Sequence, residues 1–131
     1  MEMDFMKSEN QNVFQADTVS DYDLDNGGLH SVFFASGNGK YFALARDFDE
    51  DDETIYFERD DQGNCKYVYP SNVQYLVQNG TVEFLFDDAV AQDDIFGKKF
   101  TISFVPLPNE DYEKMKRKLA LIWGKSEPGS S

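Results

Sequence analysis

The sequence predicts an α+β domain, in which an antiparallel β-meander of about seven to eight strands is followed by one C-terminal amphipathic helix packed on the sheet. From residue 12 to residue 105, short aromatic and β-branched segments alternate with Gly, Asn, Asp and Pro, which is the pattern of strands joined by tight turns. After Pro108 the apolar spacing changes to steps of three and four, the helical period. Strands and helices do not alternate along the chain, so we expect an antiparallel rather than a parallel sheet.

The length of the chain predicts a single domain. Its 131 residues are enough to bury a core without a metal or a disulfide framework. Twelve Phe, seven Tyr and one Trp distinguish it from a disordered acidic chain. We expect residues 12–124 to form the domain, residues 1–11 to be a flexible N-terminal segment and residues 125–131 to be a disordered tail.

Five strands are expected in the first part of the chain, and the last four pair as two hairpins. The turn of the first hairpin is Gly37-Asn38-Gly39, because glycine permits the positive φ that a tight turn needs. Both strands of this hairpin look mostly buried, since they are rich in aromatic and aliphatic residues. The five segments are residues 13–19, 29–36, 40–46, 54–59 and 65–69.

The strongest turn signal is Asn79-Gly80, because these residue types suit both positive-φ positions of a type I′ turn. A two-residue loop fixes the register of the strands on either side. It places six side chains on one face, which we expect to face the core. The opposed pairs are Val77 with Val82, Tyr75 with Phe84 and Val73 with Phe86.

The last strand and the helix complete the predicted domain. Residues 98–105 alternate apolar and polar side chains, as a half-buried strand does. Asn109 is expected as the N-cap of the helix and Gly124 as its C′ residue. Lys114 and Lys118 are expected on the solvated side of the helix. Its core stripe is expected to be Tyr112, Met115, Leu119 and Ile122.

The charge of the chain is unevenly distributed. The formal net charge is -13, and the first sixty residues hold fifteen of the twenty-five acids and four of the twelve bases. The densest part is residues 47–53. Such a surface speeds encounter with a cationic partner and repels nucleic acid and anionic lipid, so neither nucleic acid nor membrane is expected as a partner. A plainer interpretation also stays open, in which the acidic run only keeps the protein soluble.

The counts of cysteine and histidine exclude several kinds of chemistry. Cys65 and His30 each stand alone, so one chain forms no disulfide, no multi-histidine zinc site and no Cys/His cluster. A single thiol, with no signal sequence and no membrane-spanning apolar run, predicts a cytoplasmic protein.

The acidic residues give no matched ligand set. Asp21, Asp23 and Asp25 have the one, three, five spacing of a calcium loop, but Asn26 and Val32 stand where that loop needs glycine and a bidentate glutamate. Among twenty-five acids some pair falls at glycosidase spacing by chance. We therefore assign no catalytic, cofactor-binding or metal-binding residues.

Tyrosines lie close to the acidic run in the sequence. Tyr56 and Tyr67 are expected on neighbouring strands, where they would pair across the sheet. Tyrosine combines apolar area with a polar tip and recurs at protein interfaces. Core packing and a partner-binding surface are both open interpretations of these residues.

Two short words of sequence flank the acidic run: Tyr41-Phe42-Ala43-Leu44-Ala45-Arg46 before it and Tyr56-Phe57-Glu58-Arg59-Asp60-Asp61-Gln62 after it. A hairpin and a terminal helix follow. In this order the chain resembles, over residues 13–124, the Imm10 family of immunity proteins, which are found beside bacterial polymorphic toxins. It departs from the family at Tyr69-Pro70-Ser71-Asn72, where a glycine-rich turn is expected.

The resemblance implies a non-enzymatic protein that binds and neutralises a cognate toxin inside the producing cell. An acidic inhibitor suits a basic nuclease, whose active surface is cationic, and steric blocking of another effector suits the chain almost as well. The expected partner-binding residues are Asp47, Asp49, Glu50, Asp51, Asp52, Glu53, Tyr56, Glu58, Asp60, Asp61 and Tyr67.

Two other classes of function stay open. One is a small-ligand-binding or carboxylate-dependent hydrolytic domain, which an enclosed apolar pocket with convergent acids would favour. The other is an acidic scaffold or nucleic-acid mimic. A shallow, exposed acidic face would favour the inhibitor over the hydrolytic domain.

Overall fold

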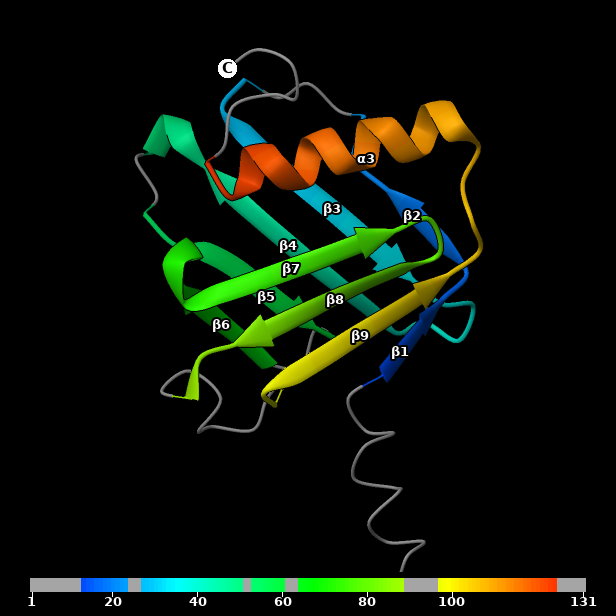
Figure 1. Ribbon diagram of the computed structural model, residues 1–131, viewed down its shortest axis with the longest axis horizontal. Helices are drawn as coiled ribbons and strands as arrows, with labels where there is room; N and C mark the ends of the chain where they lie inside the picture. The colour runs from blue at the N-terminus through cyan, green and yellow to red at the C-terminus, as the bar shows by residue number, and fades with distance from the viewer. Residues whose placement is uncertain (1–12, 24–26, 51–52, 61–63, 89–96, 125–131) are drawn as a thin grey trace, which may run out of the picture.

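The computed structural model describes residues 13–23, 27–50, 53–60, 64–88 and 97–124, so the two predicted flexible ends lie outside the described residues. Within these ranges the chain forms nine strands and one C-terminal helix, which confirms the predicted α+β class. The strands belong to two sheets that lie face to face, and the helix runs across one end of the pair (Figure 1).

The five-stranded sheet is an antiparallel meander, and the four-stranded sheet lies in front of it in Figure 1. The five-stranded sheet has the order β2 (Thr18–Ser20), β3 (Leu29–Ala35), β4 (Tyr41–Asp47), β5 (Ile55–Arg59), β6 (Asn64–Val68). The four-stranded sheet has the order β1 (Val13–Ala16), β9 (Lys99–Phe104), β8 (Thr81–Phe86), β7 (Val73–Gln78). The remaining elements are the short 3-10 helices η1 (Phe48–Glu50) and η2 (Pro70–Asn72) and the helix α3 (Asn109–Ile122).

The register predicted for the β7–β8 hairpin is confirmed. Val77 opposes Val82, Tyr75 opposes Phe84 and Val73 opposes Phe86 across the turn at Asn79-Gly80. Gly80 has φ of 114°, a conformation that favours glycine. All six side chains lie in or against the core, as the alternation requires.

The single strand predicted for residues 13–19 is wrong, because the chain changes sheets at Asp17. β1 pairs in parallel with β9, whereas β2 pairs antiparallel with β3. The Asp17 amide donates to the Ala35 carbonyl at 2.7 Å, and its carboxylate accepts a hydrogen bond from the Gly37 amide. These contacts hold the bend, and the four-stranded sheet gains a parallel pair that local sequence does not indicate.

The β3–β4 hairpin forms as predicted, but only one of its faces is buried. Val32, Phe34, Phe42 and Leu44 are fully buried, and the residues between them are half-buried on the opposite side. The prediction of two mostly buried strands is therefore wrong. The five-stranded sheet has one core face and one outward face, as antiparallel sheets commonly do.

Stacked aromatic rings join the two sheets. The Phe42 ring lies 5.7 Å from that of Phe84 and 4.8 Å from that of Phe100, between centroids. The Phe57 and Phe84 rings meet edge to face at 5.6 Å. These contacts place Phe42 and Phe57 of the five-stranded sheet against the four-stranded sheet in one continuous core.

Helix α3 closes one end of this core and packs against β3. The predicted stripe is confirmed, since Met115, Leu119 and Ile122 are buried and Tyr112 is half-buried against them. The Trp123 indole nitrogen donates to the Val73 carbonyl at 2.9 Å, so the end of the helix is fixed to the edge strand β7.

The two ends of the helix differ in how well they match the prediction. Gly124 has φ of 81°, as expected for a C′ glycine. Asn109 is the first helical residue and not the N-cap, a position that Pro108 occupies without a side-chain capping bond. The Asn79 side chain instead fixes the entry to the helix through two 2.7 Å hydrogen bonds with the Leu107 backbone.

Candidate protein-binding surface

The outward side of the five-stranded sheet lies opposite the core and the helix. Neighbouring residues on it follow from the strand register: Ser31, Ala45, Tyr56 and Tyr67 form one row, and Phe33, Ala43, Glu58 and Cys65 form the next. All are half-buried except Tyr67, which is 68% exposed. We call this surface the open face and define it as Ser31, Phe33, Ala35, Tyr41, Ala43, Ala45, Tyr56, Glu58, Cys65 and Tyr67.

The open face differs in composition from the outward side of the four-stranded sheet. The latter is mostly polar, and its Glu83 and Lys99 form an ion pair at 3.7 Å. The open face carries aromatic and small side chains and a single charged group, Glu58. Depletion of charge together with enrichment in tyrosine is the composition of the buried centre of a protein interface.

Aromatic side chains on the open face meet in two pairs, one between β3 and β4 and the other between β5 and β6. The Phe33 and Tyr41 rings stack at 5.1 Å, and the Tyr56 and Tyr67 rings are also 5.1 Å apart. Ala43 and Ala45 lie between these pairs, since each is opposite an aromatic or acidic neighbour in the register. The centre of the open face therefore consists of small side chains, and the larger aromatic side chains surround it.

Glu58 is held in place by two phenols. The Tyr41 hydroxyl donates to Glu58 Oε2 at 2.9 Å, and the Tyr56 hydroxyl donates to the same carboxylate. Burial, the hydrogen bond to Glu58 and the negative charge of Glu58 together raise the pKa of Tyr56 to about 12, and burial is the largest of these causes. Tyr56 therefore stays a neutral donor at physiological pH.

The acidic loop, residues 47–53, leaves the sheet at one end of β4. The Asp49 carboxylate accepts a hydrogen bond from the Gly28 amide at 3.0 Å, and the Asp49 amide donates to Asp47 Oδ1 at 3.0 Å. These two acids thus help to build the turn of η1. Glu50 and Glu53 are exposed, and Asp51 and Asp52 lie outside the described residues.

Phe48 anchors the acidic loop to the body of the domain. The Arg46 guanidinium lies over its ring at 4.4 Å and also donates to the Ile122 carbonyl at 3.2 Å. The His30 ring packs edge-on against the Phe48 ring, with 5.8 Å between centroids. Figure 1 shows η1 beside the C-terminal end of α3, where these contacts fix it.

The prediction that Lys118 is solvated is wrong. Lys118 is 7% exposed, and its Nζ lies 3.1 Å from His30 Nδ1. The stem of the lysine covers apolar area between α3 and β3. His30 therefore joins the same structural cluster as Lys118, and Lys114 is exposed as expected.

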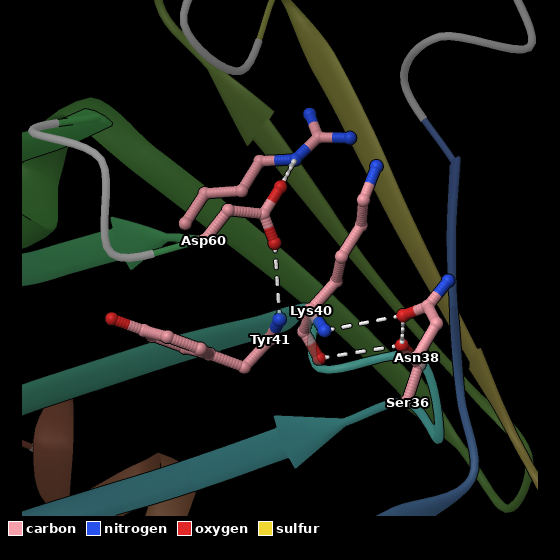
Figure 2. Close-up of polar contacts among 6 residues, drawn as sticks. Ser36, Asn38, Lys40, Tyr41 and Asp60 are labelled. Carbon is pink, nitrogen blue, oxygen red and sulfur yellow. Dashed lines mark hydrogen bonds and ion pairs between the residues drawn. The ribbon is translucent and has the colours of Figure 1, made fainter.

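Asp60 lies at the other end of β4 from the acidic loop. It has φ of 61°, its Oδ1 accepts from the Tyr41 amide at 3.0 Å, and its Oδ2 is 3.7 Å from Arg59 Nε. Figure 2 shows Asp60 reaching across to Tyr41, beside the turn held by Ser36 and Asn38. The Asn38 side chain accepts from the Lys40 amide at 3.1 Å.

The predicted partner-binding residues consequently fall into separate places. Because β4 runs from Tyr41 to Asp47, about 20 Å separate Asp60 from the acidic loop. Tyr56, Glu58 and Tyr67 lie together on the open face between them. Asp61 lies outside the described residues.

Sequence reasoning did not find the β3 and β4 members of the open face. Phe33, Tyr41, Ala43 and Ala45 are missing from the predicted set because both strands were expected to be mostly buried. The strict alternation in Tyr41-Phe42-Ala43-Leu44-Ala45 was the available signal, since residues two apart share a face.

The other candidate sites in the described part of the chain offer fewer groups that could bind a ligand or catalyse a reaction. An open cleft of about 620 Å³ is lined by Asp17, Lys40 and Arg59 among others, and so holds one carboxylate and two cations. Among the described residues, no group of three or more His, Cys, Asp or Glu is placed to hold a metal ion. Residues 24–26 of the calcium-like spacing lie outside the described residues. No helix in the described ranges is long and apolar enough to cross a membrane.

Comparison of the chain with known protein families, with curated proteins and with solved structures gives no match.

Proposed function

We propose that this protein is a non-enzymatic inhibitor that binds a cationic protein through its open face, and that the partner is a cognate bacterial toxin. The observation that carries the proposal is the open face itself: four aromatic residues around an alanine centre on the outward side of the five-stranded sheet. The resemblance to immunity proteins supports the identity of the partner. The resemblance also implies that the protein acts inside the producing cell, in the cytoplasm.

The two kinds of residue act at different stages of binding. Tyr56 and Tyr67 offer amphipathic area close to small side chains, so they would become the desolvated centre of the interface and set the dissociation rate. The exposed acids of the acidic loop stay at the rim and raise the association rate with a basic partner. A basic nuclease suits this charge, because its active surface must hold phosphates.

The hydrolytic alternative finds less support in the described cleft. Carboxylate-dependent hydrolysis needs two acids flanking a bound substrate. Asp17 is the one carboxylate lining that cleft, and it accepts a hydrogen bond from the Gly37 amide. The cations Lys40 and Arg59 lie in the same lining.

The open face is tested by the double substitution Tyr56→Ala with Tyr67→Ala. We expect its affinity for the product of the neighbouring open reading frame to fall about 100-fold or more, mainly through faster dissociation. Surface plasmon resonance measures both rates, and survival of cells that express the toxin measures protection.

Leu76→Ala is the matched control, because Leu76 is a 60% exposed apolar residue on the outward side of the four-stranded sheet. It should leave both rates unchanged. Loss of binding in the control together with full binding by the tyrosine variant would place the interface on the wrong sheet and overturn the proposal.

A further inference from the structure

Glu58 is the one charged residue within the open face. Its neighbours across the strands are Ala43 on one side and Cys65 on the other. The cations closest in sequence point to the opposite side of the sheet: the Arg59 guanidinium lies over the Phe100 ring at 5.0 Å, and Lys66 Nζ lies 5.7 Å from the Phe86 ring. Among the described residues, Glu58 is therefore contacted by two phenol donors, Tyr41 and Tyr56.

In this setting the Glu58 carboxylate is oriented to bind a cation. Tyr41 and Tyr56 fix its orientation and satisfy part of its accepting capacity, and a carboxylate retains further lone pairs for a second, bidentate partner. The rings of Tyr56 and Tyr67, 5.1 Å apart beside it, offer π faces on which a flat cation can lie. Small neighbours such as Ala43 leave room for that cation.

Guanidinium matches this arrangement better than ammonium. It is planar, weakly hydrated and able to donate two parallel hydrogen bonds to one carboxylate while its face rests on an aromatic ring. An ammonium is a compact and strongly hydrated charge, which is costlier to bring onto a surface with little other charge. The charge complementarity therefore selects arginine.

We propose that Glu58, Tyr56 and Tyr67 form a receiving site for one arginine side chain of the partner protein. This inference rests on the proposed function, because it names the group by which the partner would be recognised at the open face. It assigns Glu58 to specificity, whereas the acidic loop contributes long-range attraction.

The probe for this site is N-acetyl-arginine-methylamide, titrated into the whole protein labelled with ¹⁵N, with the lysine analogue as the comparison. We expect saturable shifts of the β5 and β6 amides around Glu58, with about fivefold weaker or absent binding of the lysine analogue. Glu58→Gln should weaken binding of the arginine analogue at least about fivefold. Glu83→Gln, on the outward side of the other sheet, is the control and should leave it unchanged.

Equal binding of both analogues, or unchanged binding by Glu58→Gln, overturns the arginine site. Retained secondary structure in circular dichroism shows that Glu58→Gln is folded, and Glu58→Asp gives a second variant that keeps the charge but shortens its reach. The expected order of affinity for the arginine analogue is wild type, then Glu58→Asp, then Glu58→Gln.

The partner-binding assay separates the two proposals. If the neighbouring toxin binds wild type and Glu58→Gln equally, the arginine site is wrong and the proposed function stands. If the arginine analogue binds at Glu58 but the toxin does not bind the protein, the proposed function is wrong and the site stands.

Discussion

At the scale of single residues, position on a strand decides what each tyrosine does. Tyr56 is one residue from the buried Phe57, yet it faces outward and donates to Glu58. Tyr75 faces inward, and its ring lies 4.4 Å from that of Trp123. Residue type alone does not distinguish these two roles. Position along the strand does, because successive side chains point to opposite faces of the sheet.

The Tyr56 phenol contributes stability that depends on pH. Its pKa in the folded protein, about 12, lies above the ordinary value of 10, so folding favours the neutral form. The contribution is full below pH 10 and is lost as the pH rises through 12. We expect Tyr56→Phe to be about 1 kcal/mol less stable at pH 7, through loss of the bond to Glu58, and this difference to shrink above pH 10.

Urea unfolding of wild type and Tyr56→Phe at pH 7, 10 and 11 measures this difference. Burial also raises the pKa of Tyr75, so both proteins lose stability in alkali, and only the gap between them reports on Tyr56. A gap that stays constant from pH 7 to pH 11 contradicts the assignment.

At the scale of elements, contacts across the chain determine the shape of the acidic loop. The Phe48 amide donates to the Gly28 carbonyl at 2.9 Å, and the Gly28 amide donates back to Asp49. A Cβ on Gly28 would lie 2.7 Å from the Asp49 amide nitrogen, which is backbone and cannot rotate away. The loop therefore depends on a glycine about twenty residues before it.

Gly28→Ala tests this dependence. We expect it to lower the free energy of unfolding by about 1 to 3 kcal/mol, as overpacking typically does, because η1 must shift. Chemical denaturation measures the loss. Adding Asp49→Ala should not restore stability, because the backbone contact remains; full restoration would show that only the side chain is crowded.

How much the sequence predicts also varies between elements. The β7–β8 register follows from Asn79-Gly80 because a two-residue turn leaves no freedom. The parallel pairing of Phe14 with Ile102 was not predictable, since no local pattern links strands that far apart. Tyr56 and Tyr67 belong to one hairpin, so their pairing could be predicted from the sequence. Tyr41 and Glu58 meet because β4 pairs with β5, and the acidic loop separates these two strands in the sequence.

At the scale of the whole molecule, charge and apolar area are separated. Little of the net charge of -13 lies on the open face, where Glu58 is the single acidic residue. The acidic loop lies at one end of that face and Asp60 at the other. Long-range attraction and close contact are therefore assigned to different residues of one sheet.

Glu50→Gln with Glu53→Gln tests this separation, because both side chains are exposed. We expect the association rate with the toxin to fall several-fold at low salt, on the order of 3- to 10-fold, with little change in the dissociation rate. Stopped-flow mixing at several salt concentrations measures it. An association rate with wild-type magnitude and salt dependence means that these acids serve solubility alone.

The inward lysine of β6 has a consequence for assembly. β6 is the last strand of its sheet, and an edge strand offers unpaired backbone groups to any incoming strand. Lys66 turns its stem toward the core and its ammonium toward Phe86, and an inward-pointing charge on an edge strand is one of the features by which sheets avoid edge-to-edge pairing. The same lysine that completes the core therefore discourages fibre-like growth of the sheet, which keeps the protein available to partners that approach its face.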